Sequence, residues 1–354
     1  MKTLPHVRGL GEEGARPPWP VVCATLGSLL CCPRMALGPD DLAFVAAVTG
    51  AARTSGPGER LQSLWGGYGE LLRVRLVGAP MPSAIVKRVR PPRSRDAQGR
   101  SHARKKRSYE VETTWYQTLA TRCDETCRVP RLYGAAGAAD GQLIVLEDLD
   151  DAGFAGRRID AAPKERRACL AWLAAFHALF LGVPPGDLWR EGTYWHLATR
   201  PDELRATEDL PLRRAAPHLD ERLRSAKHQT LVHGDAKEAN FCFSRQGDAV
   251  AAVDFQYVGG GVGVKDVAYL LSDLAGDAAE LEFVDVYFAH LQRELSRRGH
   301  GASADQVEGE WRALYPVARA DFHRFLAGWA KDHWRRDEKG RRVTAAFLRA
   351  AGLD

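Results

Sequence analysis

The sequence has no apolar run long enough to span a membrane, and it lacks the compositional marks of unusual protein classes. The longest apolar stretch, residues 21–32, is 12 residues long, whereas a membrane-spanning helix needs about 20. Apolar residues make up 45% and charged residues 27% of the 354 residues, which excludes a disordered or collagen-like chain. No internal repeat is present. We expect a globular protein of one large bilobal domain or two small ones.

The cysteine patterns of a zinc site or a disulfide scaffold are also missing. The chain has seven cysteines, an odd number, and none of them forms a CxxC pair. No second pair follows Cys123 and Cys127 at a spacing typical of zinc sites. Reduced thiols in a cytoplasmic protein are therefore expected.

The N-terminal segment lacks the basic lead of a secretory signal peptide. Residues 21–32 resemble the apolar part of such a peptide, but Glu12 and Glu13 precede them. We therefore expect residues 1–36 to be a disordered extension. The alternative is that residues 1–34 lie ahead of the true start, because Met35 heads a more ordinary N-terminus.

The strong positive charge typical of a nucleic-acid-binding protein is absent as well. The formal net charge is only +5 at pH 7. Residues 88–107 hold nine basic residues and one acidic residue, and we interpret this segment as a solvated loop. It contains no Phe, Trp or Tyr on which bases could stack, so no nucleic-acid partner is expected.

Hydrophobic periodicity predicts strands in the first part of the chain and helices in the second. The first part gives a helix at 40–48, a turn at 55–58, strands at 72–76, 83–87 and 143–146, and a helix at 109–120. The second part gives helices at 165–181, 281–295 and 311–329 and short strands at 231–232 and 249–253. We expect a small strand-rich lobe over residues 37–148 and a larger helical lobe over residues 149–354.

The segment His233–Asn240 carries the clearest chemical signal. Asp235 and Asn240 are five residues apart, which is the spacing of the catalytic-loop Asp and the metal-binding Asn in kinases. Asp254 follows at the end of a short apolar strand, and carboxylate and amide oxygens are ligands that Mg²⁺ prefers. A lone Gly-Asp pair is more often an ordinary turn, but these three residues in order predict a phosphoryl-transfer site.

Upstream residues match the rest of such a site. Lys87 ends a predicted strand, where a phosphate-binding lysine is expected, and Glu112 lies on the following helix, where it can pair with that lysine. Gly66, Gly67 and Gly69 lie between two strands and would let the backbone close over phosphates. A surface lysine, a solvated glutamate and a hairpin turn are the ordinary alternatives for each feature taken alone.

Together these motifs resemble the small-molecule kinase superfamily of aminoglycoside phosphotransferases, choline kinases and ecdysteroid kinase-like proteins. The resemblance covers residues 60–335 and rests on WGGYGE, IVK ending at Lys87, SYEVETTWY, LIVLEDL, LAAFHA, HGDAKEAN, and VDFQ followed by KDVAYLL. Gln256 and the long segment before the helix at 109–120 look most like the ecdysteroid kinase-like branch.

The resemblance implies an α+β, protein-kinase-like fold of two lobes and Mg²⁺-dependent transfer of phosphate from ATP to a hydroxyl of a small molecule. It implies that Asp235 is the catalytic base, that Asn240 and Asp254 are the magnesium ligands, and that Lys87, held by Glu112, binds the α- and β-phosphates.

It further implies that the backbone of Glu147, Asp148 and Leu149 forms a hinge that meets adenine. His233 and Asp266 are interpreted as structural residues, and His177 as a core histidine.

Some features depart from kinase patterns or leave alternatives open. The chain has Asp-Phe-Gln and no Ala-Pro-Glu, so it lacks the activation segment of a protein kinase, and residues 259–265 lack a P-loop ending and suggest a flexible loop. A non-catalytic nucleotide-binding module that acts through partners is the alternative function. The acceptor and the oligomeric state are not indicated, although an acceptor frame from Trp311, Trp329, Trp334 and Asp321, joined by Tyr194–His196, is weighed against an ordinary core.

Overall fold

The strand-rich part of the chain begins with helix α1 (Pro39–Thr49) and contains a five-stranded sheet. The computed structural model describes residues 37–91, 99–138 and 141–354, which belong to one unit, Pro33–Asp354. The strands are β1 (Arg53–Ser63), β2 (Gly69–Val77), β3 (Ser83–Val89), β4 (Leu132–Ala138) and β5 (Gly141–Glu147). Their order is β1-β2-β3-β5-β4, and all neighbours are antiparallel. The extension expected at 1–36 lies outside the described residues.

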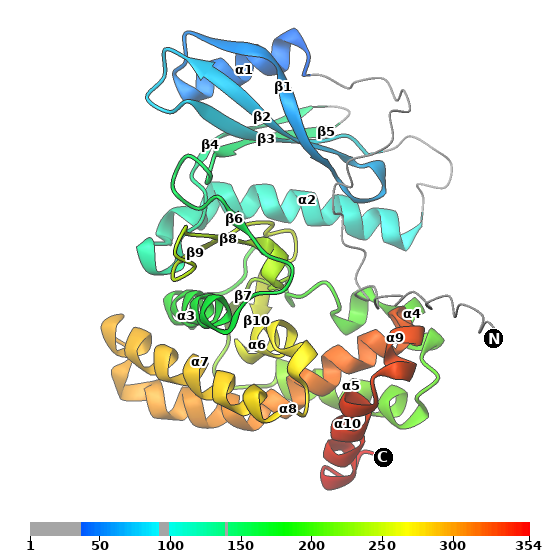
Figure 1. The fold of residues 1–354 in the computed structure, drawn as a ribbon. Helices are drawn as coiled ribbons and strands as arrows, with labels where there is room; N and C mark the ends of the chain where they lie inside the picture. Colours follow the sequence, from blue (N-terminus) through cyan, green and yellow to red (C-terminus); the bar gives the residue numbers. More distant parts are fainter. Residues whose placement is uncertain (1–36, 92–98, 139–140) are drawn as a thin grey trace, which may run out of the picture. The chain divides into compact units, whose positions relative to one another are not determined.

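Alternation along the strands places apolar side chains on both faces of this sheet. On β5, Leu143 and Val145 join the cluster that includes Val45 of α1, whereas Ile144 and Leu146 join the cluster that includes Trp115 of α2 (Arg100–Thr118). Figure 1 shows α1 and α2 on opposite sides of the sheet. Because side chains alternate with period two, one strand serves both layers.

The turn predicted at residues 55–58 is wrong, because these residues lie within the edge strand β1. Gly56 and Gly58 have φ values of 80° and 92°, and the register against β2 shifts between Ser55 and Glu59. Left-handed glycines build such a bulge without strain, and an edge strand tolerates the intervening proline. Turn-forming residues here bend a strand and do not end it.

The solvated loop predicted over residues 88–107 is also wrong. Residues 88 and 89 end β3, residues 92–98 lie outside the described part, and residues 100–107 form the first turns of α2. Arg104, Lys105 and Arg107 each donate a hydrogen bond to a group in the second half of the chain. These tertiary contacts stabilise a helix that residue pattern alone did not indicate.

The second part of the chain is mainly helical, which confirms the expected α+β class. Its helices are α3 (Pro163–Leu179), α4 (Pro201–Ala206), α5 (Leu210–Arg224), α6 (Val264–Leu270), α7 (Ala278–Arg297), α8 (Ala304–Trp329), α9 (Lys331–Arg336) and α10 (Glu338–Ala350). Among the described residues, no helix is both long and apolar enough to cross a bilayer. The lobe boundary at residue 148 falls inside one unit and stays a prediction.

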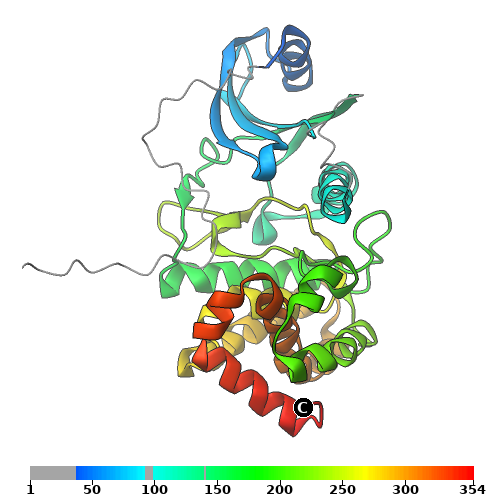
Figure 2. The ribbon, with the colours of Figure 1, turned by 90° about the vertical axis from the view of Figure 1, so that its right-hand side faces the viewer.

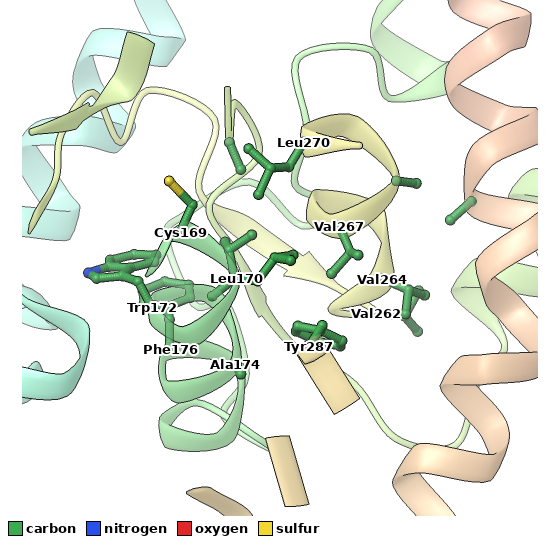
Figure 3. Close-up of a cluster of buried hydrophobic side chains, with 14 of the residues drawn as sticks. Cys169, Leu170, Trp172, Ala174, Phe176, Val262, Val264, Val267, Leu270 and Tyr287 are labelled. Carbon is green, nitrogen blue, oxygen red and sulfur yellow. The ribbon is translucent and has the colours of Figure 1, made fainter. Parts of the chain in front are cut away.

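Helix α3 lies at the centre of this part. Leu170, Trp172 and Phe176 are nearly or fully buried, and Figure 3 shows them in a cluster with Val264 and Val267 of α6. In Figure 2, α3 lies directly beneath the short strands that carry the polar loops described below. The apolar spacing that predicted this helix therefore marks the face that supports those loops.

Five short strands lie among the first helices of this second part. They are β6 (Gly156–Arg157), β7 (Thr230–Val232), β8 (Phe241–Phe243), β9 (Val250–Ala252) and β10 (Gly259–Gly261). β7 pairs with β10, and β8 pairs with both β6 and β9.

The flexible loop expected at residues 259–265 is wrong. Gly259–Gly261 form β10, and an added Cβ at Gly259 would lie 2.2 Å from the carbonyl oxygen of Trp189, with one at Gly260 lying 2.6 Å from that of Arg190. Glycine is needed here because another backbone segment approaches closely.

We expect Gly259→Ala to destabilise the protein, by about 1–3 kcal/mol, because the methyl group displaces the Trp189 backbone. Urea unfolding measures this change. Gly309→Ala is the matched control: it lies in α8 with open space around its Cβ position, so helix propensity predicts unchanged or slightly higher stability. Equal midpoints for Gly259→Ala and the parent would contradict the packing argument.

Candidate active site

A buried lysine joins three elements at one end of the sheet. Lys87 on β3 places its Nζ 2.9 and 2.6 Å from the two carboxylate oxygens of Glu112 on α2 and 3.0 Å from Oδ1 of Asp254. Burial alone would lower the pKa of Lys87, but the Asp254 and Glu112 carboxylates raise it above its ordinary value. The lysine is therefore a fixed positive charge, and the Lys87–Glu112 pair expected from the sequence is formed.

Asp254 follows β9 in a backbone conformation that is rare outside glycine. Its φ is 67°, and holding a non-glycine residue there costs about 1–3 kcal/mol. Burial raises the pKa of Asp254, but Lys87 and Lys105 outweigh this effect and hold it below its ordinary value. The strained backbone thus points an ionised carboxylate toward two ammonium groups.

The loop after β7 brings Asp235 and Asn240 together. The Asn240 Nδ2 donates to the backbone oxygen of Asp235 at 2.8 Å and to its Oδ2 at 2.9 Å. Lys237 Nζ lies 3.2 Å from the same Oδ2. The amide nitrogen of Asn240 is thereby committed to Asp235, which orients its side-chain oxygen away from that carboxylate.

The Asp235 loop and the Asp254 segment are joined by the backbone. The backbone N–H of Val253 donates to the Asn240 oxygen at 2.9 Å, and His233 Nε2 donates to the Val253 oxygen at 3.0 Å. His233 Nδ1 in turn accepts from the Asp235 N–H at 3.2 Å. Both ring nitrogens of His233 are therefore used to position backbone, which supports the structural interpretation of this residue.

Asp266 holds the start of the same loop. Its carboxylate accepts from the backbone N–H of His233 at 2.6 Å and of Gly234 at 2.9 Å, and lies 3.2 Å from His177 Nε2. Gly234 has φ 82°, and a Cβ there would lie 2.2 Å from the Tyr257 oxygen. These contacts agree with a structural Asp266, a core His177 and a loop that requires glycine.

Of the three expected glycines, Gly66 and Gly67 lie between β1 and β2, and Gly69 is the first residue of β2. Gly66, Gly67 and Gly69 all have positive φ, and a Cβ at Gly69 would lie 1.9 Å from the Arg88 oxygen. The Tyr68 hydroxyl lies 2.6 Å from His102 Nδ1 on α2. This contact ties the loop to the helix that carries Glu112. Because Gly66 and Gly67 carry no side chain, a ligand could contact their backbone directly.

The expected hinge lies at the end of β5, where its acidic side chains are already paired. Glu147 forms an ion pair with Arg128 at 2.5 Å, and Asp148 bonds Arg73 at 2.5 Å and Ser83 Oγ at 2.7 Å. Burial raises the pKa of Asp148, but Arg73 and Ser83 outweigh it and lower the pKa. Leu149 is buried. In the backbone, the Glu147 N–H donates to the Arg131 oxygen, and the oxygens of Asp148 and Leu149 accept from later residues, so the hinge stays a prediction.

Sequence reasoning missed a bridge from α2 to Asp254. Gln256 Nε2 donates to Asp254 Oδ1 at 2.6 Å, and its Oε1 accepts from Ser108 Oγ at 3.1 Å and Lys105 Nζ at 3.0 Å. Lys105 had been assigned to the solvated loop. Its spacing from Glu112, seven residues or two helical turns, would have placed it on the same face if the helix had been extended to Arg100.

Most of the expected acceptor frame belongs to the core. Trp311 and Asp321 are 0% and 2% exposed, Trp334 is buried too, and Asp321 pairs with Arg324 at 2.7 Å. Trp329 is partly exposed and stacks on Phe325. Within Tyr194–His196, Trp195 and His196 are buried, and the backbone N–H of Tyr194 donates to the Gly234 oxygen at 3.1 Å.

Comparison with solved structures finds the same fold in one kinase, and two further similar chains are given with it. The microcompartment-associated aminopropanol kinase is 16% identical, with 88% of this chain and 98% of that chain covered and a TM-score of 0.52. The type VIII aminoglycoside-3'-phosphotransferase is 16% identical over 80% and 98% of the chains, with a TM-score of 0.41. An ethanolamine kinase of Plasmodium vivax is 13% identical over 82% of both, with a TM-score of 0.46.

A search of curated proteins finds no significant match. The model of the phosphotransferase enzyme family, in contrast, matches residues 61–302, which hold the glycine loop, Lys87, Glu112, the Asp235 loop and Asp254. This match covers more than half of the chain, and so the protein belongs to the phosphotransferase enzyme family.

Proposed function

We propose that this protein is an ATP- and Mg²⁺-dependent kinase that phosphorylates a hydroxyl group of a small molecule. The proposal rests on the contacts of Lys87 with Glu112 and Asp254. Backbone hydrogen bonds join the Asp254 segment to the loop of Asp235 and Asn240. Phosphoryl transfer asks mainly for positioning and charge stabilisation, and this arrangement supplies both.

The donor set fits a magnesium-bound nucleotide. Asp254 offers an ionised carboxylate, and Asn240 offers an amide oxygen whose nitrogen is committed to Asp235. These hard oxygen ligands would hold Mg²⁺, which supplies neutralisation of phosphate charge when bound. Lys87 would contact the α- and β-phosphates, the backbone at Gly66, Gly67 and Gly69 would cover them, and Glu147–Leu149 would meet adenine.

In the proposed step, the acceptor oxygen attacks the γ-phosphorus of ATP. A new O–P bond forms, the bond from the γ-phosphorus to the bridging oxygen of ADP breaks, and the hydroxyl proton moves to Asp235. The Asp235 Oδ2 is oriented by Asn240 and Lys237. Asp235 therefore acts as the base, and Lys237 stabilises the negative charge of the Asp235 carboxylate.

Several finer assignments accompany this proposal. Gln256 supports placement in the ecdysteroid kinase-like branch, and a cytoplasmic location agrees with the free thiols of Cys123, Cys127, Cys169 and Cys242. The helical structure of residues 100–107 supports the absence of a nucleic-acid partner, because Arg104, Lys105 and Arg107 are engaged within the chain.

A non-catalytic nucleotide-binding module is the alternative. Such proteins commonly lose the lysine, the base or a metal ligand, whereas this chain retains all of them. A thermal-shift titration with Mg-ATP and an ATP-consumption assay over a panel of alcohols separate the two functions. Nucleotide binding without turnover of any alcohol would favour the module.

Asp235→Asn is expected to reduce phosphoryl transfer by about a hundred- to ten-thousandfold, because the amide cannot accept the proton. Binding of Mg-ADP, measured by calorimetry, is expected to stay near the parent value. Asp285→Asn is the control, since Asp285 is 68% exposed and its partner Arg312 lies on the surface of α8. Parental turnover in Asp235→Asn would refute the assignment of the base.

Asp254→Asn is expected to weaken Mg-ATP binding itself, because a metal-binding charge and a partner of Lys87 are removed. Calorimetry with a non-hydrolysable ATP analogue, with Mg²⁺ and then with EDTA, measures the gain in affinity that Mg²⁺ provides. We expect that gain to fall by about tenfold or more, equivalent to about 1.4 kcal/mol. An undiminished gain would show that Asp254 is not a ligand.

Gln256→Ala should raise the Mg²⁺ concentration that gives half-maximal turnover, because Asp254 loses the amide that links it to α2. A fall in kcat/KM for Mg-ATP of about tenfold is expected for one such hydrogen bond. Gln142→Ala is the matched control, since Gln142 also bonds α2, through Thr113 Oγ1 at 3.2 Å, but does not contact Asp254. Equal Mg²⁺ dependence in both variants would contradict the bridge.

A further inference from the structure

Three cations lie around the Asp235 loop: Lys237 and Arg200 are paired with carboxylates, and Arg104 is not. Arg104 reaches from α2 to the second part of the chain, where its Nη1 donates to the Thr199 oxygen at 2.9 Å. Its other side-chain bonds go to the hydroxyls of Ser101 and Tyr257. Within the described ranges, no Asp or Glu lies in ion-pair distance of Arg104.

A second guanidinium lies close to the first. Arg200 donates from Nε to the Tyr194 oxygen at 2.6 Å and from Nη1 to Glu203 at 2.9 Å. Burial lowers the pKa of Arg104, and the positive charge of Arg200 lowers it further. Glu203 offsets this repulsion between the two guanidiniums only in part, because the pKa of Arg104 stays below its ordinary value. Neighbouring guanidiniums are a common device for binding carboxylate and phosphate.

The carboxylates that a cationic acceptor would need are already engaged. Glu203 is paired with Arg200, Asp235 contacts Asn240 and Lys237, and Asp321 is paired with Arg324. Glu191 lies 2.9 Å from His196 Nδ1. Asp220, which lies within 4.8 Å of Glu191 and His196, has no ion pair among the described side chains. An ammonium group on the acceptor would therefore find no free carboxylate at Glu203, Asp235 or Asp321.

The aromatic faces that could bind a cation are filled from within the chain. The Arg200 guanidinium lies 5.7 Å from the ring centre of Tyr194 and 5.1 Å from that of Phe325. Arg107 lies 6.0 Å from the ring centre of Trp189, which stacks on Tyr257. These distances are those of cation–π contacts, so the protein's own arginines take the places of a ligand cation.

Tyrosine hydroxyls supply the neutral hydrogen-bonding groups of the same region. Burial raises the pKa of Tyr269, and its hydrogen bonds to Tyr194 and Asp235 raise it further, so its phenol stays protonated. Tyr257 likewise remains a neutral phenol, because burial raises its pKa despite the lowering effect of Arg200 and Arg104. Neutral hydroxyls beside guanidiniums donate hydrogen bonds to an anion.

Resting on the proposed kinase function, we propose that the acceptor is an anionic alcohol whose carboxylate or phosphate group binds Arg104 and Tyr257 next to Asp235. Arg200 strengthens this positive region through its charge, and Lys237 lies at the reacting end. The acceptor's hydroxyl then faces Asp235, and its anion provides the partner that Arg104 lacks.

The test compares alcohols that differ only in charge. Two matched sets serve as probes: glycolate, ethylene glycol and ethanolamine, and hydroxycyclohexane carboxylate, cyclohexanediol and aminocyclohexanol. A third pair, glycerol phosphate and glycerol, tests a phosphate group in place of a carboxylate group. With Mg-ATP and the full-length protein, ADP release gives kcat/KM for each probe. We expect an anionic probe to exceed its amine or neutral counterpart by about tenfold or more, as for one charge-assisted hydrogen bond.

Arg104→Gln should remove this preference, mainly by raising KM for the anionic probe, and Arg104→Lys should restore part of it. Lys106→Gln is the matched control, because Lys106 is an exposed cation on the same turn of α2. The unfolding temperatures of all three variants show whether loss of the Thr199 contact alone explains the result. If Arg104→Gln is unstable, the comparison of Arg104→Lys with the parent tests the proposal.

Preference for the amine, equal use of all charges, or no turnover of any anionic probe would overturn the anionic acceptor. Calorimetry with Mg-ADP separates this outcome from failure of the proposed function. If the protein binds Mg-ADP and prefers an amine, only the acceptor class is wrong. If it neither binds Mg-ADP nor releases ADP with any probe, the kinase function is wrong as well.

Discussion

The buried ammonium group of Lys87 is the constraint on which the rest of the site depends. A lysine buried without partners costs several kcal/mol, so its position requires Glu112 and Asp254 to be in place. The lysine and its two partners come from β3, from α2 and from the segment after β9, which are far apart in the chain. One charge thereby fixes the sheet, the helix and the candidate metal ligand relative to each other.

A second layer of polar contacts supports that constraint. Gln256 carries a hydrogen bond from Asp254 to Ser108 on α2, and Asp266 holds the backbone at His233 and Gly234. Because Ser108, Gln256 and Asp266 are buried, breaking one of these contacts leaves an unpaired polar group and a cost of about 1–3 kcal/mol. The positions of Asp235 and Asp254 are therefore determined by residues that do not themselves react.

The proposed acceptor side differs in charge from the proposed nucleotide side. Toward Lys87, positive and negative groups are paired, with Glu112 and Asp254 around one ammonium. Toward Tyr257, Arg104 and Arg200 come close together, and Glu203 neutralises only Arg200. This difference in charge balance is a property of neighbouring side chains, and each of them comes from a separate element.

The sequence by itself determined the α+β class, several of the helices and strands and the motif residues, because periodicity and spacing along the chain are local properties. Lys87 at a strand end, the Asp235–Asn240 spacing and the apolar face of the helix at 165–181 could all be read from neighbours in the chain. Only the tertiary structure decided the helix over residues 100–107, the packed strand at Gly259–Gly261 and the roles of Lys105 and Gln256. The charged first turns of α2 are held by carbonyl groups of distant residues, and the glycine strand packs against Trp189. Both features depend on contacts between remote segments, which no local sequence pattern predicts.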